Sequence, residues 1–364
     1  MKVEIWVDSV SLQPFTKKQW RSHQDQSINK HGVPKLVASR FKATTFTNEM
    51  KWYSTEYRQG QENYTIPDAM VEFAQKNGIS IRGHNVFWDN PKFQPSWVQS
   101  LSPDELRNAA VKRINSVVSR YRGKLIAWDV VNENLHFSFF EDKLGKTASA
   151  MYYQIAQQLD PTTTMFMNEY NTIEYSGDEF SSPFNYQKKL EEITSFPGKA
   201  KLSAGIGLQG HFTSGQPNLA YMRSALDMLG TTGLPIWLTE VSVQQDTNQA
   251  QYLEKISREG YAHPAVKGII MFAGPELAGF KETILADLNF KNTPVGDVVD
   301  KLIKEWNFRT LETRTDGKGI IDVSLFHGDY DVIVKHPVTN SSATLSLSVT
   351  NEKPQATINV PIHT

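Results

Sequence analysis

Two glutamates stand at the ends of apolar runs in this 364-residue chain. Residues 126–131 are followed by Asn132 and Glu133, and residues 235–239 are followed by Glu240. Short β-branched and aromatic runs are typical of buried strands, and working side chains in parallel barrels gather at the carboxyl ends of the strands. The pattern therefore predicts two carboxyl groups that project into one site.

Paired carboxyl groups suit the cleavage of a glycosidic bond. One carboxylic acid protonates the leaving oxygen, and a carboxylate attacks or stabilises the carbon that develops oxocarbenium charge. Taken singly, either glutamate could instead cap a strand through an ion pair or a backbone hydrogen bond. Polar residues that suit sugar hydroxyls at other strand ends favour the functional interpretation. They are Asn48, Lys51, His84, Trp88, Asn168, Asn171, Gln209 and His211.

Seven candidate strands alternate with amphipathic stretches, a pattern typical of βα units around a parallel sheet. They cover residues 43–46, 79–86, 125–133, 164–171, 202–211, 234–243 and 268–276. A helix is predicted from Pro103 to about Tyr121, because Ser102 is a favourable N-cap. Residues 36–41 are expected to end another helix. The predicted fold class is an α/β TIM (β/α)8-type barrel whose first βα unit is missing, because residues 13–35 offer no buried strand.

Composition limits the partners. The chain has 38 Lys and Arg against 39 Asp and Glu and no block of like charge, which disfavours nucleic acid and membrane surfaces. The 8 Trp, 13 Tyr and 19 Phe offer faces for sugar stacking, although most are expected in the core. No cysteine is present, and the first residues hold no apolar core of signal-peptide length. No metal or cofactor is expected, since no histidine cluster has ligand spacing.

Five segments resemble the strand motifs of glycoside hydrolase family ten, the xylanases. They are residues 47–52, 83–88, 128–133, 205–211 and 238–240. The similarity extends from about residue 36 to 306, and residues 293–302 resemble the plant-type branch. Residues 308–364, with short alternating strands and turn signals, form a small C-terminal β module that also resembles this branch. The barrel domain is accordingly placed at residues 36–307.

The resemblance implies endo-hydrolysis of β-1,4-xylosidic bonds in xylan or xylo-oligosaccharides, with retention through a covalent glycosyl-enzyme intermediate. Glu133 matches the acid/base and Glu240 the nucleophile, while Asn132 is placed to bond the sugar 2-hydroxyl. The other substrate-binding residues that the resemblance implies are Asn48, Lys51, His84, Trp88, Asn171, Gln209, His211 and Phe272. Of these, Asn48, Lys51, His84 and Trp88 match residues that line the glycone subsites. A monomeric, secreted or cell-wall protein is the corresponding expectation.

Three features depart from the family pattern. Ser242 stands where an aspartate is usual, so the pH profile is expected to differ, and Phe272 stands where a tryptophan is common, so stacking is expected to be weaker. Residues 1–35 resemble the end of an upstream carbohydrate-binding module and a linker, which predicts that a longer protein has lost its first βα unit. We hypothesise that residues 2–12, which are rich in β-formers, fill the place of the first strand.

The sequence leaves two alternatives to an active hydrolase open. The first is a protein that binds xylan without cleaving it, or has no function, because its barrel cannot close. The second is a transglycosylase, in which another sugar rather than water resolves the glycosyl-enzyme intermediate.

Overall fold

The computed structural model describes residues 4–8, 32–198, 201–306, 312–323, 325, 328–335, 341–349, 357 and 359–360. The chain divides into two compact units. The first covers Glu4–Asn307, and the second begins at Phe308.

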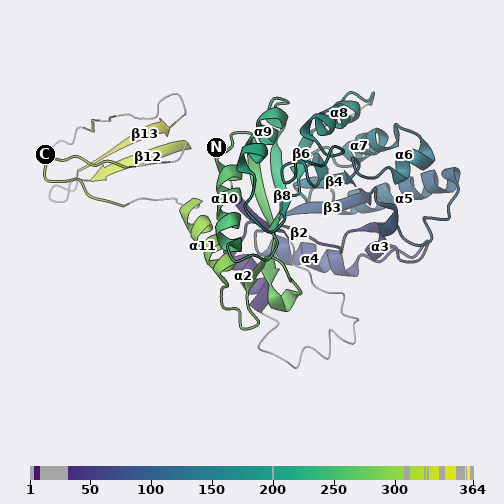
Figure 1. The fold of residues 1–364 in the computed structure, drawn as a ribbon, viewed down its shortest axis with the longest axis horizontal. Helices are drawn as coiled ribbons and strands as arrows, with labels where there is room; N and C mark the ends of the chain where they lie inside the picture. Colours follow the sequence, from purple (N-terminus) through teal and green to yellow (C-terminus); the bar gives the residue numbers. More distant parts are fainter. Residues whose placement is uncertain are drawn as a thin grey trace. The chain divides into compact units, whose positions relative to one another are not determined.

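A parallel sheet ringed by helices forms the first unit (Figure 1). The strands follow the order β1-β9-β8-β6-β5-β4-β3-β2, and the short β7 pairs with β8 outside this path. Their bounds are β1 (Glu4–Asp8), β2 (Ala43–Thr45), β3 (Ser80–Trp88), β4 (Ala127–Asn132), β5 (Thr164–Glu169), β6 (Ala204–Leu208), β7 (His211–Phe212), β8 (Ile236–Val243) and β9 (Val266–Phe272). The seven predicted strands and the TIM-type barrel are thus confirmed.

The helices lie outside the sheet, as the βα alternation predicts. Their bounds are α2 (Gly32–Arg40), α3 (Trp52–Thr55), α4 (Thr65–Lys76), α5 (Pro103–Tyr121), α6 (Phe139–Leu144), α7 (Ala148–Leu159), α8 (Pro183–Thr194), α9 (Leu219–Gly230), α10 (Gln249–Ala262) and α11 (Pro294–Trp306). The predicted start of α5 is confirmed, because Ser102 and Glu105 form a reciprocal capping box. Within the described ranges, no helix is both long and apolar enough to cross a membrane.

The first unit also contains four shorter elements. They are the 3₁₀ helices η1 (Pro91–Phe93) and η2 (Glu276–Ala278) and the strand pair β10 (Gly274–Pro275) and β11 (Ile284–Ala286).

The dense packing of the barrel core explains why Gly83 opens the motif of residues 83–88. A Cβ added at Gly83 would lie only 2.3 Å from the ring of the fully buried Trp128. Gly83 therefore lets strands β3 and β4 pack around that ring.

An eighth strand occupies the place where the sequence pattern left a gap. β1 pairs in parallel with β9, from Glu4 opposite Gly268 to Asp8 opposite Phe272, and it also lies beside β2. This agrees with the hypothesis that residues 2–12 fill the first position, of which residues 4–8 are described. No backbone pairing joins β1 to β2 within the described ranges, so the barrel is nearly closed. The boundary expected after residue 35 falls inside α2, which begins at Gly32.

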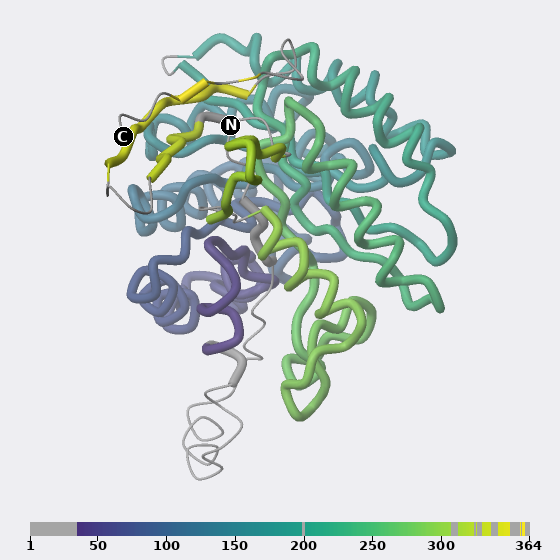
Figure 2. The backbone as a smooth tube through the Cα atoms, turned by 90° about the vertical axis from the view of Figure 1, so that its left-hand side faces the viewer, coloured from purple at the N-terminus to yellow at the C-terminus, as the bar shows by residue number. Residues whose placement is uncertain are grey.

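Helices α2 and α11, far apart in the sequence, lie side by side at this part of the barrel (Figures 1 and 2). The guanidinium of Arg40 on α2 pairs with Asp300 on α11 at 3.1 Å and donates to Asn292 at 2.7 Å. Helix α11 also contacts β1. These contacts join the two ends of the sheet through the helical layer.

The second unit contains a small antiparallel sheet. β12 (Gly328–Lys335) pairs with β13 (Ser342–Val349). Side chains of β13 alternate between exposed and half-buried, as expected for a sheet with one covered face. A turn at residues 316–319 is closed by a hydrogen bond from Gly319 N to Asp316 O. The β character predicted for residues 308–364 is confirmed in the described part of this unit.

Candidate active site

Glu133 and Glu240 lie at the carboxyl end of the sheet. Glu133 follows the last residue of β4, Glu240 belongs to β8, and both side chains are almost wholly buried. Gln209 connects them, because its side-chain Nε2 donates to Glu133 at 3.1 Å while its backbone oxygen accepts from the amide of Glu240 at 2.8 Å. The two predicted carboxyl groups therefore share one site.

The backbone of Glu133 adopts a left-handed conformation, with φ of 60°. Residues with a Cβ rarely occupy this region, and holding one there costs on the order of 1 kcal/mol. Hydrogen bonds from its own amide to Asn168 O and from Phe137 N to its carbonyl oxygen fix the turn. A glycine would relieve the strain, so a glutamate at this position favours a role for its side chain.

The carboxyl group of Glu133 is held by two donors. Trp88 Nε1 donates to Oε2 at 2.7 Å, and Gln209 donates to Oε1. Burial raises the pKa of Glu133 above its ordinary value, and the charge of Glu240 acts in the same direction, although the two hydrogen bonds and the charge of Lys51 oppose them. A raised pKa suits a carboxylic acid that must hold a proton near neutral pH.

The surroundings of Glu240 shift its pKa in the opposite direction, below its ordinary value. Burial acts to raise its pKa, but a hydrogen bond from His211 and the positive charges of His84, His211 and Lys51 outweigh burial and hold that pKa well below the usual range. His211 Nε2 lies 3.4 Å from one carboxylate oxygen, and Asn168 Nδ2 donates to the other at 3.0 Å. The environments thus separate the two pKa values, as an acid and a nucleophile require.

Asn168 and Asn171 were both predicted at a strand end, but only Asn171 was included among the substrate-binding residues, whereas the structure makes Asn168 the central one. Its Nδ2 donates both to Asn132 Oδ1, at 2.9 Å, and to Glu240, while its Oδ1 accepts from Thr239 at 2.5 Å. Asn171 instead lies beyond β5 and donates to Asp178 at 2.8 Å. A signal for Asn168 was present, because both asparagines follow the same apolar run.

Residues predicted for the glycone side come together around Trp88. Lys51 Nζ lies 4.2 Å from the ring centroid of Trp88 and donates to Asn48 Oδ1 at 3.3 Å. Tyr53 also donates to Asn48, at 2.8 Å. The arrangement combines an aromatic face, a cation and polar groups, which suits a sugar ring and its hydroxyls.

His84 is oriented by a buried ion pair that the sequence did not reveal. Its Nδ1 lies 2.8 Å from Asp129 Oδ2, and Asp129 also pairs with Arg82 beneath the site. The side chains of Asp129 and Arg82 are completely buried. This pair fixes the imidazole whose charge helps to keep Glu240 ionised.

Ser242 and Phe272 contact His211 from two directions. Ser242 Oγ lies 2.7 Å from His211 Nδ1, and the ring of Phe272 stands edge to face with the imidazole at a centroid distance of 5.4 Å. Burial acts to lower the pKa of His211, but the hydrogen bond and charge of Glu240 outweigh it and raise that pKa. Ser242 therefore holds the imidazole without adding charge.

A Ser242→Asp variant is expected to raise the pKa of His211 by about one pH unit, because an adjacent carboxylate favours the imidazolium. A Ser242→Asn variant is the matched control, since it keeps a polar partner but adds no charge. NMR titration of the imidazole measures both values. Equal pKa values in the two variants would contradict the electrostatic role given to position 242.

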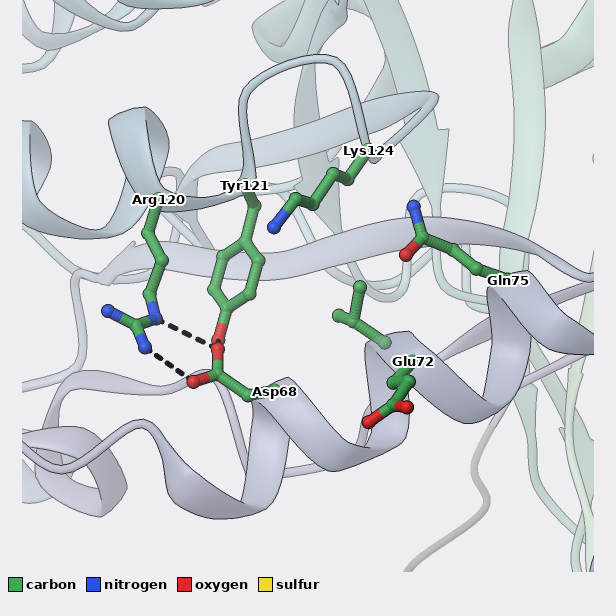
Figure 3. Close-up of a pocket in the computed structure, with 7 residues that line it drawn as sticks. Asp68, Glu72, Gln75, Arg120, Tyr121 and Lys124 are labelled. Atoms are coloured by element: carbon green, nitrogen blue, oxygen red, sulfur yellow. Dashed lines mark hydrogen bonds and ion pairs between the residues drawn. The ribbon is translucent and has the colours of Figure 1, made fainter.

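A pocket lies on the outside of the barrel between α4 and α5 (Figure 3). It is lined by Asp68, Val71, Glu72, Gln75, Arg120, Tyr121 and Lys124. Asp68 accepts from Arg120 Nε at 2.8 Å and from the Tyr121 hydroxyl at 3.1 Å, so its charge is already paired. The glutamates at the carboxyl end of the sheet remain the candidate for catalysis, as barrel enzymes place their sites there.

Comparison with known proteins identifies the family. The model of glycosyl hydrolase family 10 matches residues 14–273. The chain belongs to glycosyl hydrolase family 10. This family 10 protein is 53% identical over 404 residues to the endo-1,4-beta-xylanase 5-like protein of Arabidopsis thaliana, with 97% of this chain and 71% of the relative covered. It is 46% identical over 405 residues to endo-1,4-beta-xylanase 5 of the same plant, with the same coverage of each. The expected plant-type branch is confirmed.

The alignment with the 53% identical relative is longer than the part of this chain that it takes in. It spans 404 positions but takes in 97% of the 364 residues, so about 50 positions have no counterpart in this family 10 chain. A βα unit of a TIM barrel occupies roughly 30 residues. The unmatched positions together therefore exceed the length of one such unit.

A solved structure agrees with the fold. Xylanase 10B from Thermotoga petrophila, in complex with xylobiose, superimposes with a TM-score of 0.68 at 23% identity. The match covers 84% of this family 10 chain and 94% of that chain. It supports the barrel architecture.

Proposed function

We propose that this family 10 protein is an endo-1,4-β-xylanase that cleaves the β-1,4-xylosidic bonds of xylan with retention of configuration. The observation that carries the proposal is the pair of glutamates in one buried site, with the pKa of Glu133 raised and that of Glu240 lowered. The Arabidopsis relatives named as endo-1,4-beta-xylanases support the choice of substrate.

In the first step, the Glu240 carboxylate attacks the anomeric carbon of the xylose unit at the scissile bond. A glycosyl ester forms, and the bond from that carbon to the leaving oxygen breaks. Glu133 gives its proton to the leaving oxygen, so the released chain departs as an alcohol. The Trp88 and Gln209 donors keep the Glu133 carboxyl in place for this transfer.

In the second step, the ionised Glu133 takes a proton from water while the water oxygen attacks the same carbon. The ester bond breaks, and Glu240 leaves as a carboxylate. Two inversions at one carbon give overall retention. Asn132, whose amide is oriented by Asn168, is proposed to bond the 2-hydroxyl of the reacting sugar.

The experiment that tests this function is digestion of soluble β-1,4-xylan, followed by reducing-end and NMR analysis of the first products. We expect new reducing ends that carry the β anomer before mutarotation produces the α anomer. Products that begin as the α anomer would contradict retention. A complete lack of products from the folded protein would contradict hydrolysis itself.

A xylan-binding protein without turnover is the second candidate. The specific observation in its favour is the missing backbone pairing between β1 and β2, which lie beside each other without hydrogen bonds in the described residues. Strands that are not hydrogen-bonded there could leave the site too loose to align the two carboxyl groups. Xylan affinity by calorimetry, together with no product from the same sample, would favour this candidate.

Products from xylan with an added oligosaccharide acceptor would separate hydrolysis from transglycosylation.

We also propose that the substrate is cell-wall xylan met outside the cell, and that the protein acts as a monomer. The relationship to plant xylanases supports the first point. Size-exclusion chromatography with light scattering tests the second, and a dimer mass would contradict it.

A further inference from the structure

His136 joins two acidic side chains from different segments. Its Nδ1 lies 2.7 Å from Glu169 Oε1, and its Nε2 lies 2.8 Å from Asp178 Oδ2. Ionised carboxylates accept but do not donate, so this geometry favours the form of His136 in which both ring nitrogens carry protons. Burial acts to lower the pKa of His136, but the hydrogen bond and charge of Glu169 outweigh it and raise that pKa to about 9. The group is an imidazolium at neutral pH.

The completely buried carboxyl group of Glu169 connects two loops. It accepts from Leu135 N at 2.9 Å and from Tyr170 N at 3.1 Å, in addition to His136. Burial is the largest influence on Glu169 and raises its pKa to about 7, although the hydrogen bond and charge of His136 and the hydrogen bond from Leu135 N act to lower it. The turn that carries Glu133 is therefore tied to the start of the loop after β5.

The same loop is held at two further points. Asp178 accepts from His136 and from Asn171 on the loop itself. Glu174 accepts from the backbone amides of Gly210 and His211, at 2.7 and 3.0 Å. The loop of residues 170–182 is thus fixed between the turn of the acid/base and the histidine beside the nucleophile.

Aromatic rings of this loop contact His136. Tyr170 stacks on the imidazole at a centroid distance of 3.9 Å with an interplanar angle of 8°, and Phe180 lies 6.4 Å from it. Phe180 is 70% exposed, which is unusual for a large apolar side chain. Rings of this kind can stack on sugars.

The sheet order assigns these rings to one side of the scissile bond. In the sheet, β5 lies between β4, which ends just before Glu133, and β8, which contains Glu240. Strands β2 and β3 lie on the other side of β4. Since β2 and β3 support the residues proposed for the glycone side, the loop after β5 is on the leaving-group side. This step rests on the proposed function.

We propose that His136 is a positioning residue that clamps the loop of residues 170–182 to the acid/base turn, so that the loop presents its aromatic rings to the leaving-group side of a xylan chain. The clamp acts on binding of sugars beyond the cleaved bond and leaves the proton transfer by Glu133 unchanged.

The test is a His136→Phe variant, which keeps a ring against Tyr170 but loses both N–H donors. We expect kcat/KM for xylohexaose to fall about 10-fold, mainly through KM, because two charge-assisted hydrogen bonds that order the loop are lost. Hydrolysis of 4-nitrophenyl β-xylobioside, which places no sugar on the leaving-group side, is expected to stay within about twofold. Asp178→Asn should give the same split if His136→Phe does not fold.

His263→Phe is the matched control. His263 is a buried histidine that lies 3.0 Å from Asp227 in a different part of the barrel. This variant should affect both substrates equally or not at all. An equal loss on both substrates in the His136→Phe variant, or no loss on either, would overturn the clamp.

The clamp can be tested separately if the protein proves not to be a hydrolase. If the wild-type protein cleaves neither substrate, xylohexaose affinity is measured by calorimetry in a Glu240→Gln background. If adding His136→Phe to the Glu240→Gln protein lowers its affinity for xylohexaose about 10-fold, the clamp is supported. An unchanged affinity overturns it.

Discussion

Replacing Glu240 by Gln is expected to lower kcat/KM on xylan by at least about 10⁴-fold, the scale seen when a covalent nucleophile is removed. The amide keeps the size of the side chain but cannot attack the anomeric carbon. Asn168 and His211 would still surround it, so xylan binding should persist. Reducing-end assays measure the turnover, and calorimetry with xylohexaose measures the binding.

Glu254→Gln is the matched control for this prediction. Glu254 lies on α10, outside the site, and pairs with Arg258 and Lys301 at the surface. The same chemical change there should leave turnover within about twofold of wild type, since exposed ion pairs contribute little. A Glu240→Gln protein that retains a tenth or more of wild-type activity would exclude Glu240 as the nucleophile.

Replacing Glu133 by Gln should have an effect that depends on the leaving group. Xylan cleavage is expected to fall by about 10³-fold, because the leaving sugar oxygen needs a proton. Release of 2,4-dinitrophenolate from 2,4-dinitrophenyl β-xylobioside needs no proton, so the first burst of product should remain within about tenfold of wild type. Stopped-flow absorbance measures that burst.

The pH profile gives a second signature of Glu133. The side chain must be protonated for the first step, so wild-type activity should fall as the pH rises through its raised pKa. Glu240 must be ionised, and its lowered pKa places the acidic limb well below neutral pH. The alkaline limb should disappear in Glu133→Gln. The assignment of Glu133 would be contradicted if Glu133→Gln lost equal activity on xylan and on 2,4-dinitrophenyl β-xylobioside and kept the alkaline limb.

Much of the site could be predicted because it repeats one local pattern, a polar residue that directly follows an apolar run. Glu133, Glu240 and Gln209 all follow this pattern, and parallel strands bring such residues to one edge. The same rule could not choose between Asn168 and Asn171, which are three residues apart. Strand β5 ends at Glu169, and its pleat turns Asn168 toward Glu240.

Other parts of the site depend on contacts between distant segments, which local patterns do not encode. His136 bonds to residues that are 33 and 42 positions away, and Arg82 and Asp129 are separated by 47. The place of Glu4–Asp8 beside β9 was a hypothesis drawn from β-rich composition. Only the register against residues 268–272 shows that this strand extends the barrel sheet.

Trapping the glycosyl-enzyme intermediate tests the central claim most directly. A 2-deoxy-2-fluoro-xylobioside with a 2,4-dinitrophenyl leaving group would form the ester but resist its hydrolysis, because the fluorine destabilises the oxocarbenium-like transition state. Mass spectrometry of the intact protein and its peptides should show one added disaccharide per chain, attached to Glu240. A label on Glu133 or another residue, or continued turnover of xylan with no label, would contradict the account.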